Sequence, residues 1–137
     1  MKNVIVVAIT LTLIQLTHWE LYTNFPRLVH INYGAVWGIP VPNFASVIMT
    51  LVGLGILAYL GATVRPRWST PLLLILTSGL SNLADRLRYG GVVDYIDTKI
   101  WPIFNVPDII IVVAVAWYLL SMALKAQSFR RSALPKP

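Results

Sequence analysis

Four long apolar segments in a chain of 137 residues constrain the fold more than any other feature of this sequence. A helix needs about 20 apolar residues to cross the hydrocarbon core of a bilayer. Only 12% of the residues are charged, whereas a soluble domain carries roughly 25%. An open sheet could not cross lipid, because its edge groups would lack hydrogen-bond partners. We therefore expect an all-α membrane protein with four transmembrane helices, at Val4–Tyr22, Phe44–Val64, Pro71–Leu87 and Val106–Leu124.

The basic residues indicate the orientation of these helices. With four spans, both termini and the loop at 65–70 share one side, which holds seven of the eleven basic residues: Lys2, Arg65, Arg67, Lys125, Arg130, Arg131 and Lys136. Lysine and arginine are in excess on the cytoplasmic side of membrane proteins, so we expect this side, with both termini, to be the inner one. The net charge of +6 is explained by this topology, and we expect no nucleic-acid partner. All five acidic residues fall on the outer side: Glu20, Asp85, Asp94, Asp97 and Asp108.

The division into domains follows from the same pattern. We expect one transmembrane domain over residues 1–126 and a basic, disordered cytoplasmic tail over 127–137. The two outer loops have strand-like composition at Leu28–Ile31, Val36–Ile39 and Val92–Ile96. Because both loops lie on the same face, they are expected to form a small β platform on the outer surface.

The third apolar segment turns polar in its second half. Ser78, Asn82 and Asp85 follow at steps of four and three, which places them on one helix face. Such a face contacts protein or a water-filled cavity rather than lipid. For Ser78 we expect a hydrogen bond between helices. For Asp85 a structural and a functional role are both open, and Arg86 can extend outward or turn to a carboxylate.

Asp108 lies just inside the last apolar segment. With Asn105 as N-cap, Pro107 falls in the first turn and Asp108 at the third helical position, as in a capping box. Capping alone could explain this carboxylate. The helix dipole also favours an ionised Asp108, and a nearby second carboxylate would be pushed towards its protonated form. Two such groups provide a base and an acid.

The partner of Asp108 is not settled by spacing. Asp85, Asp94 and Asp97 all qualify by topology, but Asp94 and Asp97 are three residues apart, so only one would face a site. Paired carboxylates could also bind Mg²⁺ or Ca²⁺, or relay protons. The absence of cysteine excludes thiol catalysis, and two histidines, His18 and His30, are too few for a His-rich metal site.

Three ordered blocks of this sequence resemble the signal peptidase II family. S-N-L-A-D-R-L-R-Y-G-G-V-V-D-Y-I-D and W-P-I-F-N-V-P-D match the family pattern N-x-x-D-R, V-V-D-F and F-N-x-A-D, and N-Y-G-A-V-W-G-I matches an earlier loop block. The resemblance implies an intramembrane aspartic endopeptidase that needs no metal or cofactor. It implies that Asp94 and Asp108 are catalytic and that five residues support the site or the substrate: Asn32, Asn82, Asp85, Arg86 and Asn105.

The first helix departs from the family pattern. The family carries D-Q-x-T-K where this chain reads I-Q-L-T-H, so Ile14 and His18 replace an acid and a lysine, while Gln15 and Thr17 remain. The lost ion pair is expected to weaken the bracing of this helix. His18 is interpreted as an interfacial histidine that could still reach an outer carboxylate.

The resemblance also implies a substrate and a location. The substrate would be a bacterial prolipoprotein cut before a cysteine carrying diacylglycerol, processed in the inner membrane near its outer face by a monomer surrounded by lipid. Three alternatives remain open. A catalytically impaired relative would bind precursors without cutting them, an ion or proton transporter would use the acids as a path, and a structural four-helix protein would do neither.

Overall fold

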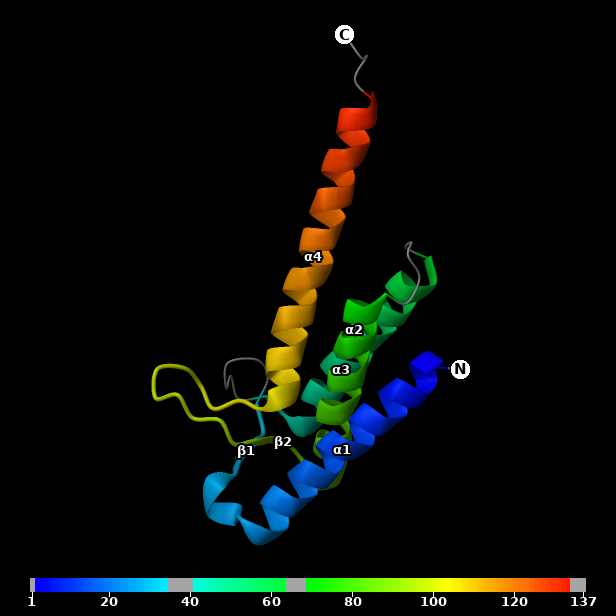
Figure 1. The fold of residues 1–137 in the computed structure, drawn as a ribbon. Coiled ribbons are helices and arrows are strands. Elements are labelled where there is room, and N and C mark those ends of the chain that lie inside the picture. Colours follow the sequence, from blue (N-terminus) through cyan, green and yellow to red (C-terminus); the bar gives the residue numbers. More distant parts are fainter. Residues whose placement is uncertain (1, 35–40, 64–68, 134–137) are drawn as a thin grey trace.

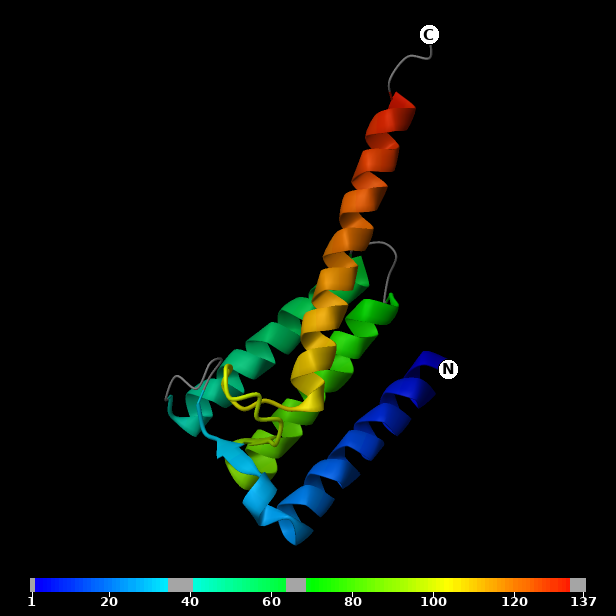
Figure 2. The same cartoon turned by 60° about the vertical axis from the view of Figure 1, so that its left-hand side comes forward.

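The computed structural model describes residues 2–34, 41–63 and 69–133. Four helices make up most of it: α1 (Lys2–Asn24), α2 (Asn43–Thr63), α3 (Thr70–Tyr89) and α4 (Val106–Ala133). Helix α3 packs against α1, α2 and α4 and forms the centre of the bundle. Figures 1 and 2 show that α1 begins and α4 ends toward the same end of the molecule, with the small sheet toward the other end.

Each apolar segment of the sequence is a helix, and every helix end except the C-terminal end of α4 lies within two residues of the predicted one. Among the described residues, three helices are long and apolar enough to cross a bilayer, over Val4–Asn24, Asn43–Thr63 and Val106–Phe129. Helix α3 falls below that standard because its last turns carry Asp85, Arg86 and Arg88. The four-span count and the orientation of the termini therefore stay predictions.

Burial differs between α3 and the helices around it. Leu72, Thr77, Ser78, Ser81 and Asp85 of α3 are all buried. The surrounding helices instead expose many large apolar side chains, which is the pattern of helices that face lipid. The polar face of α3 therefore points into protein, as its spacing predicted.

Helix α3 ends at a left-handed glycine. Gly90 has φ 78°, a conformation that glycine adopts without steric cost, and its N–H donates to the carbonyl oxygen of Arg86 at 3.2 Å. This C-cap turns the chain into strand β2 (Val92–Asp94). The strand that carries Asp94 thus begins only a few residues after the polar end of α3.

The loop before α2 and the loop after α3 form a two-stranded antiparallel sheet, which confirms the predicted β platform in outline. Strand β1 (His30–Asn32) pairs with β2, and His30 lies opposite Asp94. The first strand starts later than predicted, because Pro26–Leu28 form a 3₁₀ turn, η1. The second ends earlier than predicted, at Asp94, after which Ile96 makes an isolated bridge to Phe104. The strand predicted at 36–39 lies outside the described residues.

The last helix is longer than the sequence indicated. Helix α4 continues to Ala133, so residues 127–133, predicted to be a disordered tail, are helical. Strong helix formers such as Ala126 and Gln127 follow the apolar segment, and no glycine or proline interrupts it before Pro135. Residues 134–137 lie outside the described part, and a domain boundary at 126 stays a prediction.

Candidate active site

A cavity of about 370 Å³ lies where the sheet meets the ends of α3 and α4. Side chains from α2 and from the loop at 101–104 complete its wall. Five of the seven predicted site residues line this one cavity: Asn32, Asn82, Arg86, Asp94 and Asp108. The fold therefore brings together residues that are up to 76 positions apart in the chain.

Asp94 ends strand β2, and its side chain is 1% exposed. Its Oδ2 accepts a hydrogen bond from Asn32 Nδ2 at 3.0 Å, and Asn32 Oδ1 accepts one from the N–H of Gly34 at 3.0 Å. The other oxygen of Asp94, Oδ1, has no hydrogen-bond partner among the described residues. Burial raises the pKa of Asp94 to about 7, the bond from Asn32 opposes this rise, and the nearby Asp108 carboxylate adds to it. Asp94 can therefore hold a proton near neutral pH.

Asp108 lies in the first turn of α4, in the capping arrangement that the sequence predicted. The N–H of Asp108 donates to Asn105 Oδ1 at 2.9 Å, and the N–H of Asn105 donates to Asp108 Oδ2 at 3.2 Å. Asn82 Nδ2 donates to the other oxygen, Oδ1, at 2.9 Å. Hydrogen bonds to both carboxylate oxygens, together with the helix N-terminus, are the surroundings that an ionised aspartate requires.

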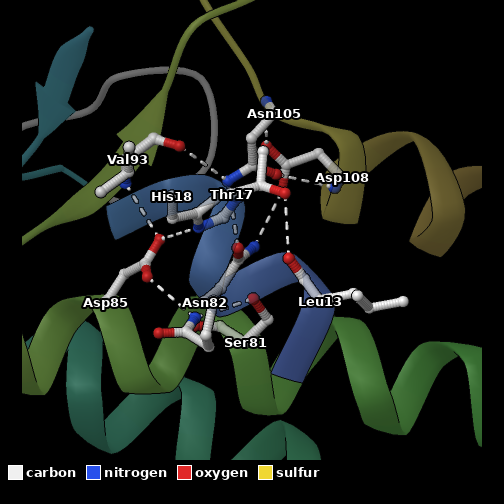
Figure 3. Close-up of polar contacts among 10 residues, drawn as sticks. Leu13, Thr17, His18, Ser81, Asn82, Asp85, Val93, Asn105 and Asp108 are labelled. Carbon is white, nitrogen blue, oxygen red and sulfur yellow. Dashed lines mark hydrogen bonds and ion pairs between the residues drawn. The ribbon is translucent and has the colours of Figure 1, made fainter. Parts of the chain in front are cut away.

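Asn105 connects three elements around these aspartates. Its side chain is fully buried, and Nδ2 donates to Asn82 Oδ1 at 3.1 Å and to the carbonyl oxygen of Val93 at 3.3 Å. These bonds join α4 to α3 and to the strand that carries Asp94. Figure 3 shows Asn105 beside Asp108, with dashed lines from Asn105 to Val93 and to Asn82.

Asp85 is expected from the sequence to be satisfied by Arg86 or Asn82, its neighbours at the end of the third apolar segment, but its partners are different. It is fully buried but does not line the cavity, and neither Arg86 nor Asn82 bonds to it. Its Oδ2 accepts from His18 Nδ1 at 2.7 Å and from the N–H of Val93 at 3.2 Å, and its Oδ1 accepts from Gln15 Nε2 at 3.0 Å. The side chains of Asn82 and Asp85 point to different neighbours of α3, because Asn82 bonds to α4 whereas Asp85 bonds to α1.

His18 is therefore not an interfacial histidine, since its side chain is fully buried against Asp85 (Figure 3). Gln15 also donates to the backbone and hydroxyl oxygens of Ser81, each at 3.0 Å. These bonds fasten α1 to α3. The expectation that loss of the family's ion pair weakens the bracing of this helix stays a prediction. The sequence left open that His18 could reach an outer carboxylate, but 67 positions separate it from Asp85, so spacing did not identify the partner.

Arg86 turns inward rather than toward lipid. Its Nη1 donates to the carbonyl oxygen of Gly34 at 3.1 Å and to Ser46 Oγ at 3.0 Å. It thereby joins α3 to the first outer loop and to the start of α2. Its positive charge lowers the pKa of Asp94, against the larger effect of burial. Ser46, which no sequence pattern singled out, is part of this contact.

The remaining polar residues that the sequence singled out lie apart from the cavity. Asp97 is exposed and pairs with Lys99, and Glu20 is exposed and accepts from Asn24 at 2.7 Å. Ser78 is buried, but its hydroxyl has no hydrogen-bond partner among the described residues, contrary to the predicted bond between helices. No group of three or more His, Cys, Asp or Glu side chains that could hold a metal ion occurs in the described part of the chain.

The fold and the site define a multi-pass membrane protein with one buried and one half-buried aspartate in one cavity. The family model described as signal peptidase (SPase) II matches residues 1–124. The chain belongs to the signal peptidase II family.

Named relatives and solved structures agree with this membership. The chain is 35% identical over 142 aligned positions to the lipoprotein signal peptidase of Moorella thermoacetica, covering 88% of this chain and 93% of that one. It is 37% identical over 108 positions to that of Pelotomaculum thermopropionicum, covering 73% and 70%. A solved structure described as a bacterial membrane enzyme aligns with a TM-score of 0.77 and 25% identity, over 98% of this chain and 94% of that one.

Proposed function

We propose that this protein is an aspartic endopeptidase that removes the signal peptide from bacterial prolipoproteins, cutting before a cysteine that carries diacylglycerol. Relatives that align with most of this chain bear the name lipoprotein signal peptidase. The single observation that carries the proposal is the shared cavity of Asp94 and Asp108.

The two aspartates take different roles because their surroundings differ. Asp108 accepts hydrogen bonds at both oxygens and lies at the positive end of α4, so it serves as the ionised base. Asp94 is buried with one oxygen unpartnered among the described residues and a pKa raised to about 7, so it serves as the protonated acid. Two carboxyl groups in one cavity, one ionised and one protonated, provide such an acid and base pair.

The reaction then needs one water molecule and no covalent intermediate. Asp108 takes a proton from the water while the water oxygen attacks the scissile carbonyl carbon, and Asp94 donates its hydrogen bond and then its proton to the carbonyl oxygen. The tetrahedral intermediate collapses with cleavage of the C–N bond: the proton held by Asp108 moves to the leaving nitrogen, and one hydroxyl of the intermediate returns its proton to Asp94 as the carbonyl re-forms. The products are a signal peptide carboxylate and a free α-amino group on the lipidated cysteine.

The surrounding polar residues hold these groups in place. Asn32 orients Asp94, and Asn82 and Asn105 orient Asp108. Arg86 stabilises the wall of the cavity by joining Gly34 to α2, and it provides positive charge beside the aspartates. The mechanism requires no metal and no cofactor.

The membrane arrangement belongs to the same proposal. Helix α3 packs against the three more apolar helices. It can therefore cross the membrane as the fourth span without a lipid-facing surface as apolar as theirs. With both termini on the cytoplasmic side of the inner membrane, the sheet and the cavity lie near the outer face of that membrane. A monomer then admits the substrate helix and its lipid sideways from the bilayer.

A relative that binds precursors without cutting them is not favoured by any observation. The altered sequence of the first helix is what suggests this alternative. That helix nevertheless keeps hydrogen bonds from Gln15 and His18 to Asp85.

The test is cleavage of purified, diacylglyceryl-modified prolipoprotein, with the unmodified precursor alongside. The wild-type protein is expected to cut only the lipidated form. Asp94→Asn and Asp108→Asn are each expected to lower kcat by about 10²–10⁴-fold, the scale of general acid–base catalysis. Asp97→Asn is the matched control on an exposed aspartate of the same loop and should keep wild-type activity.

Each outcome of this assay decides something. Wild-type rates for both Asp94→Asn and Asp108→Asn would refute the aspartic mechanism. Absence of product from the wild-type protein would favour the binding protein that does not cut. Equal cutting of unmodified precursor would contradict the proposed substrate.

A further inference from the structure

The buried pair of His18 and Asp85 is bonded to the strand that carries the proposed acid. Both side chains are fully buried, and 2.7 Å separates His18 Nδ1 from Asp85 Oδ2. The same oxygen accepts the N–H of Val93 at 3.2 Å. Figure 3 shows Asp85 joined by dashed lines to His18 and to Val93. Val93 directly precedes Asp94, so this carboxylate fixes the backbone from which the Asp94 side chain extends.

The connection continues to the second aspartate. The carbonyl oxygen of Val93 accepts from Asn105, whose own N–H donates to Asp108. A continuous series of hydrogen bonds therefore leads from α1, through Asp85 and the backbone of Val93, to both members of the proposed pair. The first helix enters this series at the imidazole of His18.

The position of the imidazole is itself defined on two sides. One side is the bond to Asp85, and the other is an edge-to-face contact with the Tyr95 ring, at 5.6 Å between centroids and 73° between planes. Tyr95 directly follows Asp94, so His18 contacts the residue after that aspartate directly and is linked to the residue before it through Asp85. His18 does not line the cavity, and its effect must pass through these neighbours.

We propose that His18 is a positioning residue of the peptidase, acting on Asp94 through Asp85 and the backbone of Val93; this inference rests on the proposed function. Loss of a charge-assisted hydrogen bond is costly for a buried carboxylate oxygen, so the carboxylate moves toward another donor. Asp85 would then shift, and Val93 with it. Displacement of a reacting group by about 1 Å can lower a rate by about 10²-fold, so small movements at Val93 matter.

The test compares His18→Leu with His18→Asn, two side chains of nearly equal size and shape. Asn retains an N–H donor at about the position of Nδ1, whereas Leu has none. His18→Leu is expected to lower kcat by about 10- to 100-fold with KM changed less than about twofold, and His18→Asn to restore kcat to within about threefold of wild type. Should His18→Leu not yield folded protein, His18→Phe keeps a ring against Tyr95 and tests the same loss of donor.

Coupling to Asp85 separates positioning from general packing. If His18 acts through Asp85, then adding His18→Leu to Asp85→Asn lowers kcat no further than Asp85→Asn alone. Wild-type kcat in folded His18→Leu, equal losses in the Leu and Asn variants, or multiplying losses in the double variant would each overturn the inference. Asp94→Asn is measured alongside: if it cuts at the wild-type rate, the proposed function fails, whatever the His18 variants do.

Discussion

Asn82 in α3 donates a hydrogen bond from Nδ2 to Asp108 Oδ1 in α4, across 2.9 Å. Its own Oδ1 accepts from Asn105 at 3.1 Å, so both ends of the amide are used. The central helix thus supplies a side-chain donor to the proposed base, and the N-cap of α4 fixes the orientation of that donor. The polar face of α3 is therefore part of the site as well as of the packing.

Replacement of this amide should affect catalysis more than folding. Asn82→Leu keeps the size of the side chain but leaves Asp108 Oδ1 without its donor, and we expect kcat to fall by about tenfold or more. Ser78→Ala, one turn away, removes a buried hydroxyl that has no partner among the described residues, and should leave kcat unchanged. Steady-state cleavage of lipidated precursor measures both; equal kcat in the two variants would contradict the role of Asn82.

The titration of Asp94 should appear in the stability of the protein. Its pKa rises from 3.8 to about 7 on folding, so the folded state binds more protons than the unfolded state between these pH values. The free energy of unfolding therefore loses a contribution as pH rises from about 4 to about 7, and the penalty is complete above that. Asp94→Asn cannot ionise and should gain stability over wild type, on the order of a few kcal/mol, across this range. Denaturant unfolding in detergent at pH 5 and pH 8 measures the gain; a difference independent of pH would contradict the raised pKa.

Gly91 should be intolerant of any side chain, because β1 passes directly over it. A Cβ at this position would meet the carbonyl oxygen of Asn32 at 2.7 Å and Ile31 Cγ2 at 2.8 Å. The backbone of Asn32 would have to move, and with it the amide that bonds to Asp94. Gly91→Ala is expected to cost roughly 1–3 kcal/mol of stability and to reduce activity.

The matched control for this substitution is Gly55→Ala in α2. A Cβ at Gly55 meets nothing within 4 Å, and alanine favours the helix more than glycine does. This variant should be as stable as wild type or slightly more stable by thermal unfolding. Equal unfolding temperatures for Gly91→Ala and Gly55→Ala would contradict the close packing of β1 against Gly91.

The sequence predicted those features that depend on local pattern. The helices follow from runs of apolar residues, and the bonds between Asn105 and Asp108 follow from their spacing at a helix start. The sheet follows from two strand-like loops on one face, although the turn at Pro26–Leu28 delays its first strand. These outcomes depend on residues within a few positions of each other, or on topology alone.

Other contacts could not be predicted because they depend on the way the helices face one another. His18 and Asp85 meet only because α1 packs along α3, and nothing near His18 in the chain indicates a buried carboxylate. Arg86 bonds to Gly34 and Ser46 rather than to an aspartate, since these oxygens lie beside the guanidinium once α2 is in place. Long-range partners of this kind are fixed by tertiary packing.

The central claim is that Asp94 and Asp108 act as one unit on a single water molecule. Its most direct test is the single-turnover rate of lipidated precursor cleavage by Asp94→Asn, by Asp108→Asn and by the double variant. Groups that act together lose their full effect when either is removed, so the double variant should be no slower than the slower single variant. Losses that multiply, or a wild-type rate in either single variant, would contradict the claim.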